Sequence, residues 1–105
     1  MDSLGKLLRS LREKKNFGIK KVAAELGVNY SYLSKIENDH KIPSQELLLK
    51  LCEMYDADSD QIIALLGQIP SDIREIIKEH GKEVFDTVRK QYSSFKQSKG
   101  ILDDQ

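Results

Sequence analysis

Residues 18–39 read GIKKVAAELGVNYSYLSKIEND, and this stretch decides the fold that we predict for the chain. Apolar residues recur at helical spacing on both sides of a glycine, which predicts two short helices over 19–26 and 30–38. Gly27 is expected to end the first helix in a left-handed conformation. Asn29 is expected to cap the second. The connection is so short that the two helices must cross steeply.

The buried and exposed sides of the second helix can be separated by spacing. Ala23 is small enough to let the helices approach, and Leu33 and Ile36 are expected to anchor the second helix in a core. The side chains left outside are short polar groups, an aromatic ring and a cation: Asn29, Tyr30, Ser31, Ser34 and Lys35. Such groups can reach base edges and phosphates in a DNA major groove, so we predict that this face binds double-stranded DNA.

The rest of the chain also shows helical periodicity, so we predict an all-α protein. Further helices are expected over 3–15, 45–55 and 60–66, with Ser44 as one cap and Asp58 or Ser59 as another. After a linker at 68–70, Ser71 is expected to cap the last helical region. That region reaches residue 97 and forms one helix, or two if Gly81 divides it. Residues 98–105 are expected to be disordered.

The last helical region carries an apolar stripe larger than a five-helix core requires. Its residues are Ile73, Ile76, Ile77, Val84, Phe85, Val88 and Tyr92. We predict that this stripe forms a homodimer interface, because one reading helix makes few base contacts. Proteins of this kind gain affinity from two half-sites about 34–36 Å apart. The alternatives are that the stripe covers the core of its own subunit or binds another protein.

Charge is locally segregated although the 105 residues carry 17 basic and 17 acidic side chains. Residues 6–21 hold seven basic residues against one acid, which allows a basic face despite zero net charge. Ionisable groups do not converge in the pattern of a catalytic pocket, so no enzyme and no cofactor is predicted. His40 and His80 are far apart in sequence, which argues against a metal site. Cys52 is single and is expected to be a buried, inert thiol.

The sequence shows no segment that would direct the chain into or across a membrane. Residues 1–8 are charged and lack the apolar run of a signal peptide. No apolar stretch approaches the 18 residues that a membrane-spanning helix needs. We therefore expect a cytoplasmic protein without membrane association.

Residues 3–67 resemble the Cro/CI/Xre family of helix-turn-helix DNA-binding proteins. The motifs that carry the resemblance are VAAELGV, SYLSKIEN, IPS and LLLKLCEMYDADSDQII, together with a leucine-rich first helix that bears basic residues. The resemblance implies a five-helix lambda-repressor-like domain over 1–67, followed by a C-terminal helical segment over 68–97. It also implies that helix 30–38 enters the major groove.

Individual roles follow from the resemblance. Base contacts are implied at Asn29, Tyr30, Ser31 and Lys35, and a phosphate contact at Asn38. An ion pair between Arg12 and Glu37 is also implied, and it would fix the angle of the reading helix.

The chain departs from the family at two positions near the expected DNA. Many members have a polar residue that bonds phosphate where this chain has Ile19. Either Lys20 or Lys21 supplies a point charge instead, or this contact is absent. Asp39, where the family often has glycine, would repel phosphate unless its carboxylate points away. Lys41 is a further candidate for a phosphate contact.

The sequence therefore predicts a sequence-specific DNA-binding transcriptional regulator, acting as a dimeric repressor. The alternative is an antitoxin or adaptor module whose C-terminal helices bind another protein.

Overall fold

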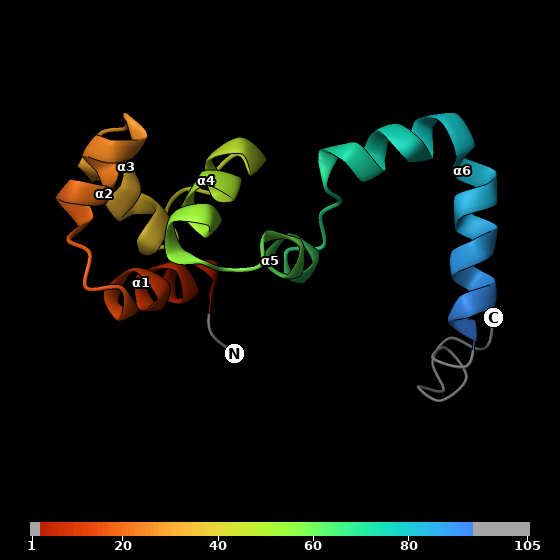
Figure 1. The fold of residues 1–105 in the computed structure, drawn as a ribbon, viewed down its shortest axis with the longest axis horizontal. Coiled ribbons are helices and arrows are strands. Elements are labelled where there is room, and N and C mark those ends of the chain that lie inside the picture. Colours follow the sequence, from red (N-terminus) through yellow and green to blue (C-terminus); the bar gives the residue numbers. More distant parts are fainter. Residues whose placement is uncertain (1–2, 94–105) are drawn as a thin grey trace. The chain divides into compact units, whose positions relative to one another are not determined.

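The structure, a computed structural model, describes residues 3–93 of the chain. This part contains six α-helices and no β-strand, which confirms the predicted all-α class. The chain divides into two compact units between Gln68 and Ile69. The first unit holds α1 to α5 and the second holds α6 (Figure 1).

Helix α1 (Leu4–Lys14) begins after a serine cap, which satisfies one of the free backbone N–H groups of its first turn. The Ser3 hydroxyl accepts a hydrogen bond from the Lys6 backbone N–H at 3.1 Å. Leu8 is 1% exposed, so the apolar side of the helix packs in the core. Two cations, Arg12 and Lys14, lie in the last turn, where the negative end of the helix dipole attracts positive charge.

Helices α2 (Ile19–Leu26) and α3 (Tyr30–Glu37) form the predicted pair. Gly27 has φ +72°, a left-handed conformation that glycine adopts without steric cost, and it ends α2 as expected. Asn29 caps α3 by accepting the Ser31 backbone N–H at 2.8 Å. Helix α3 ends at Glu37, one residue before the predicted end.

Helices α4 (Gln45–Tyr55) and α5 (Ser59–Leu65) complete the first unit. The Ser44 hydroxyl caps α4 through the Leu47 N–H at 3.1 Å, which confirms that prediction. Of the two candidate caps for α5, the structure uses Asp58, whose carboxylate accepts the Asp60 N–H at 3.0 Å. A left-handed residue, Asp56, ends α4 and turns the chain toward α5.

The core of the first unit joins one side of each of its five helices. Helix α1 packs on α3 and α4, α2 packs on α3, and α4 packs on α5. The buried apolar residues are Leu8, Val22, Ala23, Leu33, Ile36, Leu47, Leu48, Leu51, Cys52, Tyr55, Ile62 and Ile63. Full burial of one Leu or Ile side chain contributes about 1.5–3 kcal/mol, so this cluster drives the folding of the unit.

Helix α6 (Ser71–Gln91) differs from the prediction at its start. Pro70, and not Ser71, occupies the cap position, because Pro70 has extended backbone angles (φ −56°, ψ 147°) and Ser71 is already the first helical residue. No side chain caps the helix there. The predicted Ser71 cap is therefore wrong.

The interruption expected near Gly81 is found one residue earlier. His80 has non-helical angles (φ −131°, ψ 34°), and Figure 1 shows α6 bending at this point. The helix ends at Gln91. The predicted helix end at 97 and the predicted disorder over 98–105 lie outside the described residues.

The apolar side chains of α6 are largely open to solvent. No residue of α6 is buried within its unit. The exposed fractions run from 40% to 62% for Ile73, Ile76, Phe85 and Val88 of the helix and for Tyr92, which directly follows it. Ile77 and Val84 are half-buried. None of the helices in the described part of the chain is both long and apolar enough to span a membrane.

A close approach of two backbones fixes how α1 meets the end of α3. Gly5 is buried, and a Cβ atom placed on it would lie 2.7 Å from the Glu37 carbonyl carbon and closer still to the Glu37 carbonyl oxygen. The same Cβ would lie 2.7 Å from the Asp39 Oδ1 atom. Real Cβ atoms do not approach backbone this closely, so only glycine fits at this position.

We predict that Gly5→Ala destabilises the chain, although alanine is normally the better helix former by about 0.5–1 kcal/mol. Forcing α1 away from α3 is expected to lower the free energy of unfolding by about 1–3 kcal/mol. Urea denaturation followed by far-ultraviolet circular dichroism measures the change.

Gly18→Ser is the matched control in the same unit. A Cβ at Gly18 meets nothing within 4 Å, and α2 has no side-chain cap, so serine should raise stability by roughly a few tenths of a kcal/mol. Equal or greater stability of Gly5→Ala relative to the unaltered chain would show that the close approach is not a constraint.

Candidate nucleic-acid interface

The exposed side of α3 gathers the polar residues that were expected to read bases. Leu33 and Ile36 are each 1% exposed and hold the other side of the helix in the core. Tyr30 is 49% exposed, and Ser31 and Lys35 are also exposed. Asn29 lies exposed at the cap position just before them. The helix therefore presents polar groups on a rigid support.

The first turn of α3 is ordered by its own polar side chains. The Asn29 Oδ1 atom accepts hydrogen bonds from the Ser31 backbone N–H and from the Ser31 hydroxyl, both at 2.8 Å. The Asn29 Nδ2 amide has no partner among residues 3–93, so it remains available as a donor. The Ser31 oxygen keeps its acceptor capacity.

The two lysines that were alternatives for a phosphate contact lie in different surroundings. The Lys20 ammonium lies 5.0 Å from the centre of the Tyr30 ring. The Lys21 ammonium lies 5.5 Å from the centre of the Phe17 ring instead. Lys21 also borders a surface pocket lined by Phe17, Val22, Glu25 and Met54. Only Lys20 is therefore held against the start of α3.

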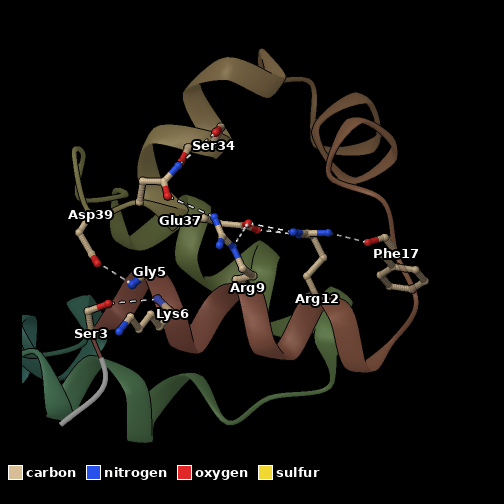
Figure 2. Close-up of polar contacts among 10 residues, drawn as sticks. Ser3, Gly5, Lys6, Arg9, Arg12, Phe17, Ser34, Glu37 and Asp39 are labelled. Carbon is tan, nitrogen blue, oxygen red and sulfur yellow. Dashed lines mark hydrogen bonds and ion pairs between the residues drawn. The ribbon is translucent and has the colours of Figure 1, made fainter.

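A buried ion pair joins α1 to the last turn of α3. The Glu37 side chain is 1% exposed, and its carboxylate accepts from Arg12 Nε at 2.7 Å and from Arg12 Nη2 at 3.0 Å (Figure 2). Arg12 Nη1 donates to the Phe17 carbonyl oxygen at 2.8 Å. The hydrogen bonds to Glu37 raise the pKa of Arg12 against the opposing effect of burial. This is the pair that the family resemblance implied.

Arg9 is a member of this network that sequence reasoning missed. Its Nε donates to Glu37 at 3.4 Å, and its Nη2 donates to Asn38 Oδ1 at 3.2 Å. The signal that could have found it is spacing, because Arg9 precedes Arg12 by three residues and shares its helix face. The side chain is 45% exposed, so the guanidinium reaches solvent beside the end of α3.

Asn38, the expected phosphate contact, is engaged within the protein at both polar ends. Its Oδ1 accepts from Arg9, and its Nδ2 donates to the Ser34 carbonyl oxygen at 2.9 Å. Nδ2 also donates to the Ser34 hydroxyl at 3.4 Å, so a phosphate contact through this amide would have to replace one of its two bonds to Ser34. The neighbouring Lys41 is exposed and forms no ion pair within the described residues, and the same holds for Lys20, Lys21 and Lys35.

Asp39 points toward α1, as Figure 2 shows. It has φ +64° and ends α3 in the left-handed position, with the His40 N–H bonded to the Lys35 carbonyl oxygen. Its Oδ1 accepts the Gly5 N–H at 2.9 Å. The Ser3 hydroxyl and the Gly5 N–H lower the pKa of the Asp39 carboxyl. The negative charge is thus compensated at the positive end of α1.

Two further buried titratable groups of the first unit, Cys52 and Tyr55, are favoured in their neutral forms. Burial raises the pKa of the Cys52 thiol, and burial, reinforced by Glu37, raises the pKa of Tyr55 to about 12. Within residues 3–93, no three His, Cys, Asp or Glu side chains are grouped so that they could hold a metal ion. What this region offers chemically is hydrogen-bond donors and unpaired cations on a surface.

Comparison with known proteins gives a family match within the first unit and matches to curated relatives. Residues 8–62 match a family described as helix-turn-helix. The chain is 34% identical over 61 residues to the HTH-type transcriptional regulator ImmR of Bacillus subtilis, covering 58% of this chain and 48% of ImmR. It is 38% identical over 65 residues to the HTH-type transcriptional regulator SlrR of the same organism, covering 53% of this chain and 43% of SlrR. The match thus spans less than half the length of either relative.

We predict that Glu37→Gln lowers the free energy of unfolding by about 3 kcal/mol, because it leaves the Arg12 charge without its buried counter-charge. Urea denaturation at fixed salt measures the loss. Glu46→Gln is the control, since Glu46 pairs with Lys50 at 3.7 Å on the surface and should cost less than about 0.5 kcal/mol. Equal costs for the two substitutions would contradict the role given to the buried pair.

Proposed function

The chain belongs to the helix-turn-helix family of the Cro/CI/Xre type, and on that basis we propose that it is a sequence-specific DNA-binding transcriptional regulator. Both relatives are named as transcriptional regulators. The observation that carries the proposal is the exposed side of α3, where Asn29, Tyr30, Ser31 and Lys35 stand on a helix anchored by Leu33 and Ile36.

In this proposal α3 enters the major groove of double-stranded DNA. The groove is about 12 Å wide and admits one α-helix. The Asn29 Nδ2 amide, the Ser31 hydroxyl and the Lys35 ammonium then meet base edges, where Lys suits the two acceptors of guanine and the Asn29 Nδ2 amide can donate to a purine N7. The buried Arg12–Glu37 pair holds the reading helix against α1 before DNA binds, which lowers the conformational entropy lost on binding.

Phosphate contacts come from cations at the two ends of α3. Lys20 lies against Tyr30, the first residue of the helix, and Lys41 follows the last residue by four positions. Eight residues of helix are about 12 Å long, close to the width of the groove, so cations beyond the two ends of α3 suit phosphates on opposite walls. Lys21 and Asn38 are the further candidates. Such contacts fix register and orientation without specifying sequence.

The regulator binds as a homodimer through α6. The apolar residues Ile73, Ile76, Val88 and Tyr92 are exposed within their own unit. Residues 71–79 carry three acidic and two basic residues, and residues 82–91 carry two acidic and three basic residues. Two copies of α6 paired in opposite directions would therefore place unlike charges together around a shared apolar stripe, as a two-fold interface requires. A dimer on an operator would repress by occupying it.

A second function, an antitoxin or adaptor, is favoured by the same open face of α6. The interruption at His80 lies beside a hollow lined by Ile76, Val84 and Val88, which could seat an apolar side chain of a different protein. The oligomeric state of the purified chain separates the two functions, because only the dimer hypothesis expects self-association.

The DNA-binding function predicts that the unaltered chain enriches a specific sequence from random duplexes. Lys35→Ala should weaken binding to that sequence by roughly 1–3 kcal/mol, and its own selection should lose preference at one or two base pairs. Gel shift at fixed salt measures the affinities. Lys50→Ala, which removes an exposed cation from α4, is the control and should keep the full sequence preference. An unchanged sequence preference in Lys35→Ala would show that Lys35 does not read bases.

The dimer hypothesis predicts opposite outcomes when glutamine replaces either of two residues of α6, Val88 or Lys90. Val88→Gln should shift the chain from dimer to monomer in analytical ultracentrifugation, because it places an amide within the apolar stripe. Lys90→Gln lies about 200° away around the helix and should leave the dimer intact. A monomeric unaltered chain, or a dimer that Val88→Gln does not weaken, would rule out α6 as the interface.

A further inference from the structure

The contact between Lys20 and Tyr30 distinguishes this chain's two candidate phosphate anchors. Lys20 is the second residue of α2, and Tyr30 is the first residue of α3. The ammonium lies 5.0 Å from the ring centre, within the range of a cation–π interaction. Ile19, which directly precedes Lys20, is partly buried against the core and offers no polar group to a phosphate.

We infer that Lys20 is the phosphate anchor of α2 and that Tyr30 is the positioning residue that holds its ammonium in place. The inference rests on the proposed DNA-binding function and deepens it. It assigns the aromatic ring of Tyr30, and not its hydroxyl, as the group that matters. The phosphate contact made from α2 is then coupled directly to the first residue of the reading helix.

An aromatic ring suits this task better than a carboxylate. A lysine side chain is long and flexible, and ordering it on DNA costs conformational entropy. A carboxylate partner would order the side chain but would also neutralise its charge and repel the phosphate. The ring face attracts the cation and leaves the positive charge uncompensated. Its ammonium N–H groups can still donate to phosphate oxygens.

Lys21 does not share this arrangement. Its ammonium lies over Phe17, in the loop between α1 and α2, beside a pocket that Glu25 and Met54 also line. An acidic residue and a residue of α4 therefore border Lys21, whereas Lys20 lies at the start of the exposed side of α3. The two neighbouring lysines form a matched pair for a test, because each substitution removes one charge from the same turn of α2.

The test measures how the dissociation constant of the full chain depends on salt, for the duplex that the unaltered chain selects and for a mixed-sequence duplex. Each phosphate contact contributes about 0.9 to the slope of log affinity against log salt. Lys20→Ala should reduce the slope by about 0.9 and the affinity about fivefold at 0.15 M salt on both duplexes. Lys21→Ala should leave the slope unchanged. Thermal melting of each variant verifies that it is folded.

Substitutions of Tyr30 separate the ring from the hydroxyl. Tyr30→Phe keeps the ring and should keep both the slope and the sequence preference. Tyr30→Leu removes the ring and should weaken binding on both duplexes. The double variant Lys20→Ala/Tyr30→Leu should bind no more weakly than Lys20→Ala alone, since the ring acts through the lysine.

Four results would overturn the inference while leaving DNA binding intact: an unchanged slope in Lys20→Ala, a reduced slope in Lys21→Ala alone, unweakened binding by Tyr30→Leu, or a lost base preference in Tyr30→Phe. The last result would mean that the hydroxyl reads a base. Failure of the unaltered chain to bind either duplex would instead overturn the proposed function, and this inference with it.

Discussion

The buried pair of Arg12 and Glu37 is the interaction on which the rest of the first unit depends. A carboxylate that is 1% exposed is stable only with a counter-charge and hydrogen bonds, and Arg12 supplies both from α1. Gly5 and Asp39 reinforce the same junction, because the backbones touch there and the Asp39 carboxylate caps α1. The end of α3 is therefore attached to α1 at two points, Gly5 and Arg12, which lie about two helical turns apart.

This junction explains how one short helix can serve as a reading surface. Eight residues are too few for a stable isolated helix, so the position of α3 comes from packing and from the buried pair. With Leu33 and Ile36 in the core, the polar residues are left on the outside in a fixed arrangement. Acidic groups near this surface are withdrawn from it: Glu37 is buried and Asp39 turns to α1. The lysines around α3 keep their charges free for phosphate.

Local features were predictable from residue patterns, whereas the one distant contact that was predicted, Arg12 with Glu37, came from the family resemblance. Helices α2 and α3 followed from apolar spacing and Gly27, because both signals act within a few residues. The need for glycine at Gly5 arises from the Glu37 backbone, 32 positions away, which no local pattern reveals. Arg9 was missed although its three-residue spacing from Arg12 places both on one helix face. Ser71 was mistaken for a cap because its residue type fits, whereas the backbone places Pro70 there.

The central claim is that the exposed side of α3, with the first turn of α2, is where DNA binds. Chemical-shift mapping of backbone amides in the isotope-labelled full chain, titrated with duplex DNA, tests it most directly. We expect the largest shifts on residues 20, 29–31 and 35, with small shifts in α4 and α5. Shifts confined to α4, α5 or α6, with α3 unaffected, would contradict it.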